Sequence, residues 1–100
     1  MDPSVVTEKL VQLHREIQDD CGYDPTAVTP ECRPLDDLPG FDSVLIPGAV
    51  RALARALGSP LPKGTKIKNI YVTDDGKRKR SIKEIAQAFC RTYAAEGKKP

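Results

Sequence analysis

Cysteine and histidine are the side chains of this sequence best suited to metal binding or redox chemistry. The chain has three cysteines, Cys21, Cys32 and Cys90, and a single histidine, His14. The cysteines are odd in number, and their spacing matches no zinc or redox motif. We therefore expect reduced thiols and no metal centre.

Two charged clusters offer further signals. Asp36 and Asp37 are paired carboxylates, but no His, Lys or additional carboxylate is clearly placed to form an acid–base pair with them, which favours roles in a loop and at a helix terminus. The basic run 77–80 could contact nucleic acid, with Tyr71 available for base stacking. Acidic residues precede this run, and we favour a solvated hairpin whose charges discourage edge pairing.

The composition is that of an ordinary soluble domain, with 39% hydrophobic and 30% charged residues. We expect one domain over 1–100, with a core at about 3–94 and a charged tail at 95–100. The first residues show no basic region followed by an apolar run, and no apolar stretch approaches the roughly 20 residues of a membrane span. The sequence thus predicts a cytoplasmic protein without a membrane contact.

The charges are distributed unevenly along the chain. Residues 1–45 carry ten acids and three bases, whereas residues 46–100 carry four acids and thirteen bases. This asymmetry predicts two surfaces of opposite sign, which bears on the choice of partner more than the net charge of +2 does.

Three segments have the apolar spacing of amphipathic helices. The first begins at Asp2-Pro3 and stops before Gly22, the second runs from near Ile46 to Leu57, and the third opens with a capping box at 81–84. Their inward faces should form an aliphatic core. The residues expected there are Leu10, Leu13, Ile17, Val50, Leu53, Leu57, Ile85 and Phe89.

The two long connections differ in character. Residues 22–42 are rich in Pro, Gly and Asp, so we expect a loop pinned across the core by Val28, Leu35, Leu38 and Phe41. Residues 69–72 and 77–80 flank an Asp-Gly turn and predict a short β-hairpin or an extended loop before the last helix. The fold class is therefore all-α, a small helical bundle with a long first loop.

The segment 35–44, Leu-Asp-Asp-Leu-Pro-Gly-Phe-Asp-Ser-Val, resembles the acyl carrier protein family. In that family a long first loop ends in Asp-Ser-Leu, and the serine begins the second helix. The resemblance continues to Leu61-Pro62 and covers about residues 5–63 and 81–93. It implies an acyl-carrier-type bundle.

The resemblance also implies a function for Ser43. Its hydroxyl would accept 4'-phosphopantetheine from coenzyme A, transferred by a separate phosphopantetheinyl transferase, with Asp42 orienting that enzyme and its metal ion. The arm would hold acyl or peptidyl intermediates as thioesters for an acyl-activating ligase and for downstream synthase or transferase enzymes. An exposed serine at a helix N-terminus suits a phosphodiester, because backbone N–H groups and the helix dipole stabilise it. The chain itself would be a carrier and not an enzyme.

The sequence departs from the family in its second helix. Family members carry acidic docking residues there, whereas residues 47–55 contain Arg51 and Arg55 and no acid. We expect a partner-binding surface of Val44, Ile46, Arg51 and Arg55 that fits dedicated enzymes with acidic or apolar faces in a specialised pathway. The family's short third helix is also missing from the longer, basic stretch 63–80.

Two alternatives stay open. Ser43 is either the modified residue or an ordinary helix-capping serine. In the second case the chain would be an unmodified, carrier-like interaction module that binds an acidic partner through its basic face. In both cases we expect a monomer.

Overall fold

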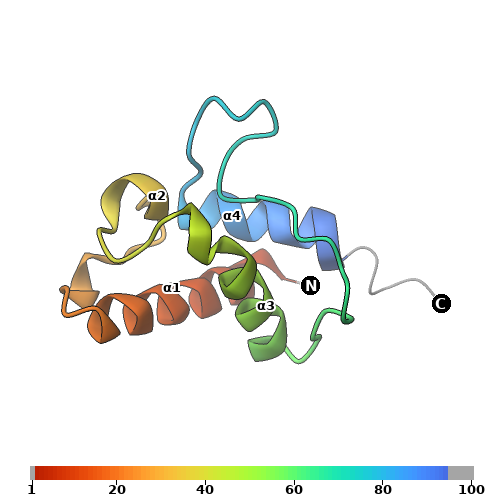
Figure 1. Ribbon diagram of the computed structural model, residues 1–100, viewed down its shortest axis with the longest axis horizontal. Coiled ribbons are helices and arrows are strands. Elements are labelled where there is room, and N and C mark those ends of the chain that lie inside the picture. The colour runs from red at the N-terminus through yellow and green to blue at the C-terminus, as the bar shows by residue number, and fades with distance from the viewer. Residues whose placement is uncertain (1, 95–100) are drawn as a thin grey trace.

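The computed structural model describes residues 2–94 and shows a mostly helical chain (Figure 1). Within that range no strand is present. The α-helices and the shorter 3-10 and π turns, labelled η, are α1 (Pro3–Asp20), η1 (Pro25–Ala27), α2 (Pro34–Asp37), η2 (Ser43–Leu45), α3 (Ile46–Ala56), α4 (Ile82–Phe89) and η3 (Cys90–Ala94). The three predicted helices are confirmed; the tail predicted at 95–100 lies outside the described residues.

Local signals set both ends of α1. The Asp2 carboxylate accepts the N–H of Ser4 at 2.9 Å, and Pro3 occupies the first turn, where its missing N–H costs nothing. At the other end Gly22 has a φ of +82°, which lets the Tyr23 N–H reach the Gln18 carbonyl at 2.8 Å. The helix therefore begins and ends where the sequence predicts.

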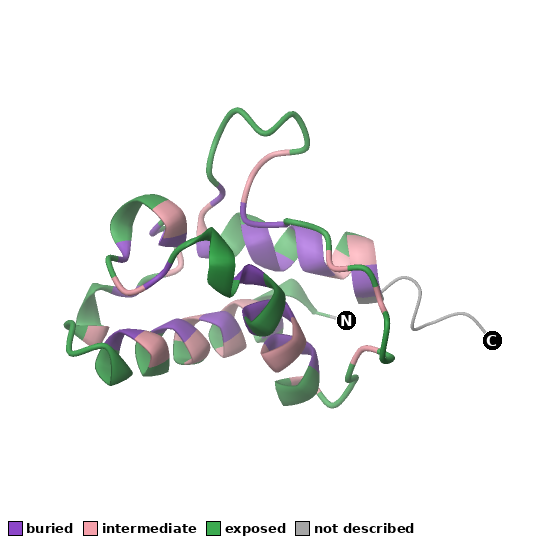
Figure 2. Cartoon of the chain, viewed as in Figure 1, coloured by how far each residue is buried: buried purple, intermediate pink, exposed green. Residues whose placement is uncertain are grey.

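The buried face of α1 is rotated from the predicted one. Its buried residues recur every fourth position, and they are Val6, Leu10, His14 and Gln18 (Figure 2). Leu13 and Ile17 are only partly buried and pack against the edge of the core. Two polar side chains therefore lie where aliphatic ones were expected.

Helices α3 and α4 both pack on α1, and together the three enclose one hydrophobic cluster (Figure 1). The predicted core residues Val50, Leu53, Ile85 and Phe89 are each at most 2% exposed, whereas Leu57 is half-buried. The start of α4 is the predicted capping box, with Ser81 and Glu84 each bonding the other's backbone N–H.

The segment between α1 and α3 is a pinned loop, as predicted, but it contains one helical turn that was not. Val28, Leu38 and Phe41 are buried in the core. The additional turn is α2, which begins with Pro34 at a position where proline is tolerated, while the Asp37 carboxylate accepts the Arg33 N–H at 2.8 Å. A turn of four residues has too little periodicity to be detected from sequence.

The segment between α3 and α4 takes the second of its two predicted forms, an extended loop, and not a β-hairpin. The predicted strands 69–72 and 77–80 meet only in one isolated antiparallel bridge, between Val72 and Lys79. Gly76, with a φ of +72°, makes the expected turn. No further strand lies beside this bridge within residues 2–94, so no ladder extends it, and the loop projects from the helices (Figure 1).

Candidate functional site

Asp42 caps the helical segment that contains Ser43. The Asp42 Oδ1 atom accepts the Val44 N–H at 3.0 Å, and its carbonyl accepts the Leu45 N–H at 3.1 Å. Ser43 is the first residue of η2, which leads directly into α3. The capping role considered for Ser43 is thus filled by its neighbour, and that interpretation needs correction.

The Ser43 side chain is exposed, and its hydroxyl makes no hydrogen bond to any residue in the range 2–94. Val44 is 83% exposed and Leu45 is 41% exposed, so apolar surface lies beside the hydroxyl. An exposed hydroxyl without a protein partner can be esterified without displacing a packed group or breaking a bond.

Only some of the predicted partner-binding residues are exposed in the structure. Val44 and Arg55 are exposed and Arg51 is half-buried, but Ile46 is only 3% exposed and faces the core. Its assignment to a docking surface needs correction, because the η2 turn directs Leu45 outward in its place. The apolar spacing of Ile46, Val50 and Leu53 already placed Ile46 on the inward face of the helix, so the sequence itself argued against that assignment.

Phe41 anchors the chain directly before the capped turn. It is 5% exposed, and its ring centroid lies 4.6 Å from that of His14 and 5.0 Å from that of Tyr71. One residue earlier, the Gly40 N–H donates to the Gln18 side-chain carbonyl at 3.0 Å. Both contacts tie the end of the long loop to α1, so the position of Ser43 depends on α1.

His14 and Tyr71 form a buried polar pair beneath this turn. His14 Nε2 and Tyr71 Oη lie 2.8 Å apart, and burial lowers the pKa of His14 to about 4 and raises the pKa of Tyr71. The sequence reasoning missed this pair. A usable signal was present, because His14 follows Leu10 by four positions on the apolar face.

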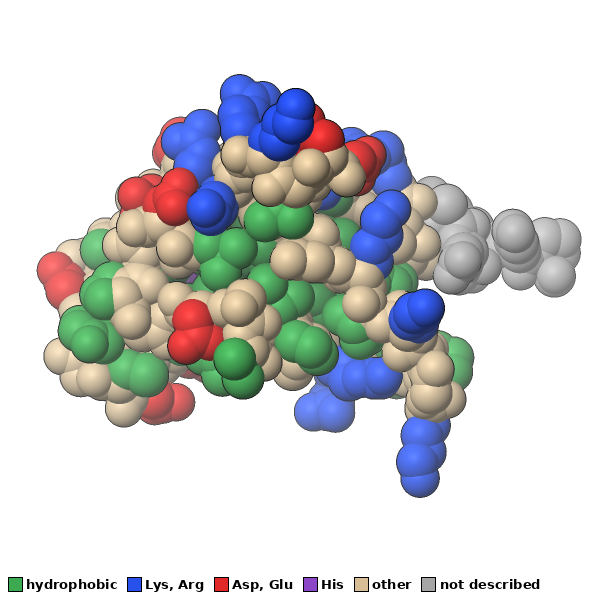
Figure 3. Space-filling model, turned by 45° about the horizontal axis from the view of Figure 1, so that its top comes forward, with side chains coloured by type: hydrophobic (Ala, Val, Ile, Leu, Met, Phe, Trp, Pro, Cys, Tyr) green, Lys and Arg blue, Asp and Glu red, His purple; other side chains and the backbone are tan. Residues whose placement is uncertain are grey.

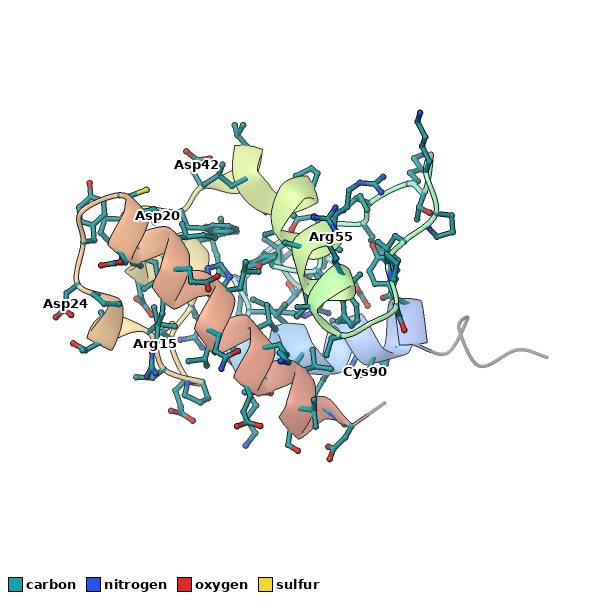
Figure 4. The ribbon with its side chains drawn as sticks, turned by 90° about the horizontal axis from the view of Figure 1, so that it is seen from below. Arg15, Asp20, Asp24, Asp42, Arg55 and Cys90 are labelled. Carbon is teal, nitrogen blue, oxygen red and sulfur yellow. The ribbon has the colours of Figure 1, made fainter. Side chains whose placement is uncertain are left out.

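The outer side of α3 carries the two predicted arginines. Arg51 Nη2 donates to the Thr65 carbonyl at 2.9 Å, which ties α3 to the following segment. Figure 4 shows Arg55 on the part of α3 that lies away from Asp42, the residue that precedes the η2 turn. The charged side chains of α3 are thus all basic, and Asp42 lies before the turn that leads into the helix.

The remaining candidate residues do not gather into a site. Cys21 is exposed, whereas Cys32 is buried, and burial raises the pKa of the Cys32 thiol. Asp36 lies 4.0 Å from Lys79 on the surface. Within residues 2–94 no group of three or more His, Cys, Asp or Glu side chains could hold a metal ion.

The basic run 77–80 divides between surface and interior. Its first three side chains are exposed on the projecting loop, whereas Arg80 is buried and pairs with Asp74 at 3.4 Å. Tyr71 is 1% exposed, so it cannot stack on a base in this conformation.

Comparisons with protein-family models, with curated proteins and with solved structures find no significant match. None of the helices described within residues 2–94 is long and apolar enough to cross a membrane.

Proposed function

We propose that this chain is an acyl-carrier-type protein that bears 4'-phosphopantetheine on Ser43. The arm holds acyl or peptidyl intermediates as thioesters while partner enzymes of a specialised cytoplasmic pathway act on them. The observation that carries the proposal is the exposed, unbonded Ser43 hydroxyl on a turn capped by Asp42. The resemblance of residues 35–44 to carrier proteins adds the chemical identity of the attached group.

The attachment is a phosphoryl-transfer step on coenzyme A. The Ser43 oxygen bonds to the phosphorus that bears the pantetheine arm, the bond from that phosphorus to the bridging oxygen breaks, and 3',5'-ADP leaves. A base of the transferase takes the serine proton. The carrier contributes the exposed hydroxyl at the N-terminal end of the η2–α3 segment, where the helix dipole favours the resulting phosphodiester anion.

The arrangement of the helices also supports the proposal. A long first helix, a pinned loop and a second helix that follows Asp42-Ser43 occur in the order that the resemblance implies. Between α3 and α4 the described chain has no helix, so this protein would lack the third helix of typical carriers. We infer that its cargo contacts differ from theirs.

An intact-mass measurement tests the proposal. The full chain is incubated with coenzyme A and several phosphopantetheinyl transferases, and a gain of one phosphopantetheine is expected for the wild type and not for Ser43→Ala. Ser59→Ala, which alters an exposed serine beyond α3, is the matched control and should keep the gain. Unchanged mass with every transferase would contradict the carrier proposal.

A second candidate is an unmodified interaction module that binds an acidic protein. The absence of any acid from α3, together with exposed Arg55, favours this candidate. It predicts binding of an acidic partner by a chain that no transferase modifies.

A further inference from the structure

The outward side of α3 is made of small residues and two arginines. Its inward side is filled by buried aliphatic residues. The outward positions are Pro47, Gly48, Arg51, Ala52, Arg55 and Ala56. Because the other side chains are short, a partner surface can approach the helix closely, and the two guanidinium groups are the only charges that it meets on α3.

The segment after α3 extends this positive charge. Residues 46–73 contain five bases and no acid. These bases, Arg51, Arg55, Lys63, Lys66 and Lys68, are defined here as the basic face. In the described part of the chain no carboxylate lies within 4.0 Å of any of them, since both ion pairs there involve Lys79 or Arg80. Figure 3 shows only Lys and Arg among the charged side chains at the lower right of the molecule.

One contact organises the basic face. The hydrogen bond from Arg51 to the Thr65 carbonyl, 2.9 Å long, holds residues 65 and 66 beside the middle of α3. Lys66 therefore lies next to Arg51 in space, and Arg55 lies one helical turn further along the same side. Charges that are already positioned lose less conformational entropy on binding than free side chains do.

We propose that the basic face docks an acidic surface of a partner protein, while Val44 and Leu45 enter an apolar depression on the same partner. The proposal rests on the proposed function, because it describes the enzymes that would reach the arm on Ser43. Val44 and Leu45 adjoin Ser43, and α3 leads away from them toward Arg51 and Arg55. One partner surface can therefore cover the apolar pair and the basic face together.

The positive charge of the basic face and the exposure of Val44 and Leu45 together indicate a protein partner. A large exposed aliphatic pair beside a charged surface is typical of protein contacts. Nucleic acid would supply the negative charge but no apolar socket, and the neighbouring Tyr71 and Tyr93 are both buried and cannot stack on bases. A protein partner can supply both an apolar depression and, through a surface rich in Asp and Glu, the negative charge that complements the basic face.

Binding of an acidic peptide tests the proposal. The probe is a Glu-rich peptide with a central Leu, titrated into the 15N-labelled full chain carrying Ser43→Ala, so that no arm can contribute. We expect NMR shifts at residues 44–45, 51–55 and 65–68, and weaker binding when Ser replaces the peptide's Leu. Salt at about 0.3 M should weaken binding strongly, since it screens exposed charges.

Two double variants with the same change in net charge separate the basic face from overall charge. Arg55→Glu with Lys66→Glu should weaken the peptide's affinity about tenfold or more. Lys77→Glu with Arg78→Glu, on the projecting loop, should change it less than about threefold, because those charges lie outside the basic face. Circular dichroism of both variants establishes that the helices are retained.

Several results would overturn the docking proposal. These are equal weakening by both double variants, shifts centred on residues 77–80, tighter binding of a random oligonucleotide than of the peptide, or self-association that is lost in Arg55→Glu with Lys66→Glu. The mass measurement on the wild type is independent of all of these. If the chain is modified on Ser43 but does not bind the peptide, only the docking proposal is contradicted. If the chain binds the peptide but is not modified, only the carrier proposal is contradicted.

Discussion

His14 Nε2 lies 2.8 Å from the Tyr71 hydroxyl, so a buried hydrogen bond joins side chains that are 57 positions apart in the chain. It connects α1 to the irregular segment before α4. The Phe41 ring contacts both side chains, and Asp42 and Ser43 follow it directly. The proposed modification site therefore stands on an aromatic cluster drawn from three separate parts of the chain.

Removal of the Tyr71 hydroxyl should destabilise the fold. In Tyr71→Phe the ring still packs against Phe41, but His14 Nε2 loses its buried partner, so the free energy of unfolding should fall by about 1–3 kcal/mol. Tyr23→Phe is the control, because Tyr23 is 45% exposed. Urea denaturation followed by circular dichroism measures both, and equal losses would contradict the role of the buried bond.

Stability should fall in mild acid because of His14. The unfolded chain takes up a proton near pH 6.5, whereas burial keeps the folded histidine neutral until its pKa of about 4. The contribution of neutral His14 is therefore complete above pH 6.5 and is lost as the pH falls from 6.5 to 4. The full loss is on the order of 3 kcal/mol.

Urea denaturation between pH 7 and pH 4.5 measures that dependence. His14→Gln, which cannot titrate, should lower the stability at pH 7 and flatten the pH profile over this range. An equally steep profile in the variant would assign the acid sensitivity to carboxylates.

Two glycines near the site should respond in opposite ways to alanine. A Cβ on Gly40 would stand 2.6 Å from the Gln18 Oε1 atom that its own N–H binds, so Gly40→Ala should cost about 1–3 kcal/mol. A Cβ on Gly48, in the first turn of α3, would meet nothing within 4 Å, so Gly48→Ala should stabilise by about 0.5–1 kcal/mol. Thermal unfolding of the two variants compares them. Unchanged stability of Gly40→Ala would contradict the close approach at Gly40, and destabilisation by Gly48→Ala would contradict the open space at Gly48.

Substitutions of Ser43 and Asp42 should have different effects on folding stability, because only Asp42 caps the turn. Ser43→Ala should change the free energy of unfolding by less than about 0.5 kcal/mol, because the hydroxyl is unbonded and exposed. Asp42→Ala should cost about 0.5–2 kcal/mol as a lost cap, and Asp42→Asn should restore most of it, because Asn also caps helices. If Ser43→Ala cost as much as Asp42→Ala, the serine would be the structural residue.

The Asp42 variants also bear on modification. Asp42→Asn keeps the cap but removes the charge that the resemblance assigns to the transferase and its metal ion. Slow phosphopantetheine transfer in a stable Asp42→Asn protein is the expected result. An unchanged transfer rate would limit Asp42 to its role as a cap.

The helices α1, α3 and α4 could be predicted from the sequence because local interactions determine them. Asp2-Pro3 and the box formed by Ser81 and Glu84 satisfy backbone groups within a few residues, and the apolar period marks the inward faces. The order of the long loop, Asp42-Ser43 and α3 followed from the same signals. We also expected the Ser43 side chain to be solvent-exposed, and its exposure is confirmed.

Tertiary packing decided what local signals left open. The apolar stripe of α1 was compatible with either Leu13 or His14 at the core, and the contacts of α1 with α3 and α4 decided for His14. The η2 turn leaves Leu45 exposed. The hairpin strands stayed unformed because no neighbour supports them. By itself the sequence determined the helices α1, α3 and α4 and the excess of basic residues after Ser43. The three-dimensional structure decided which of those side chains meet, since contacts between distant residues leave no periodic trace in the chain.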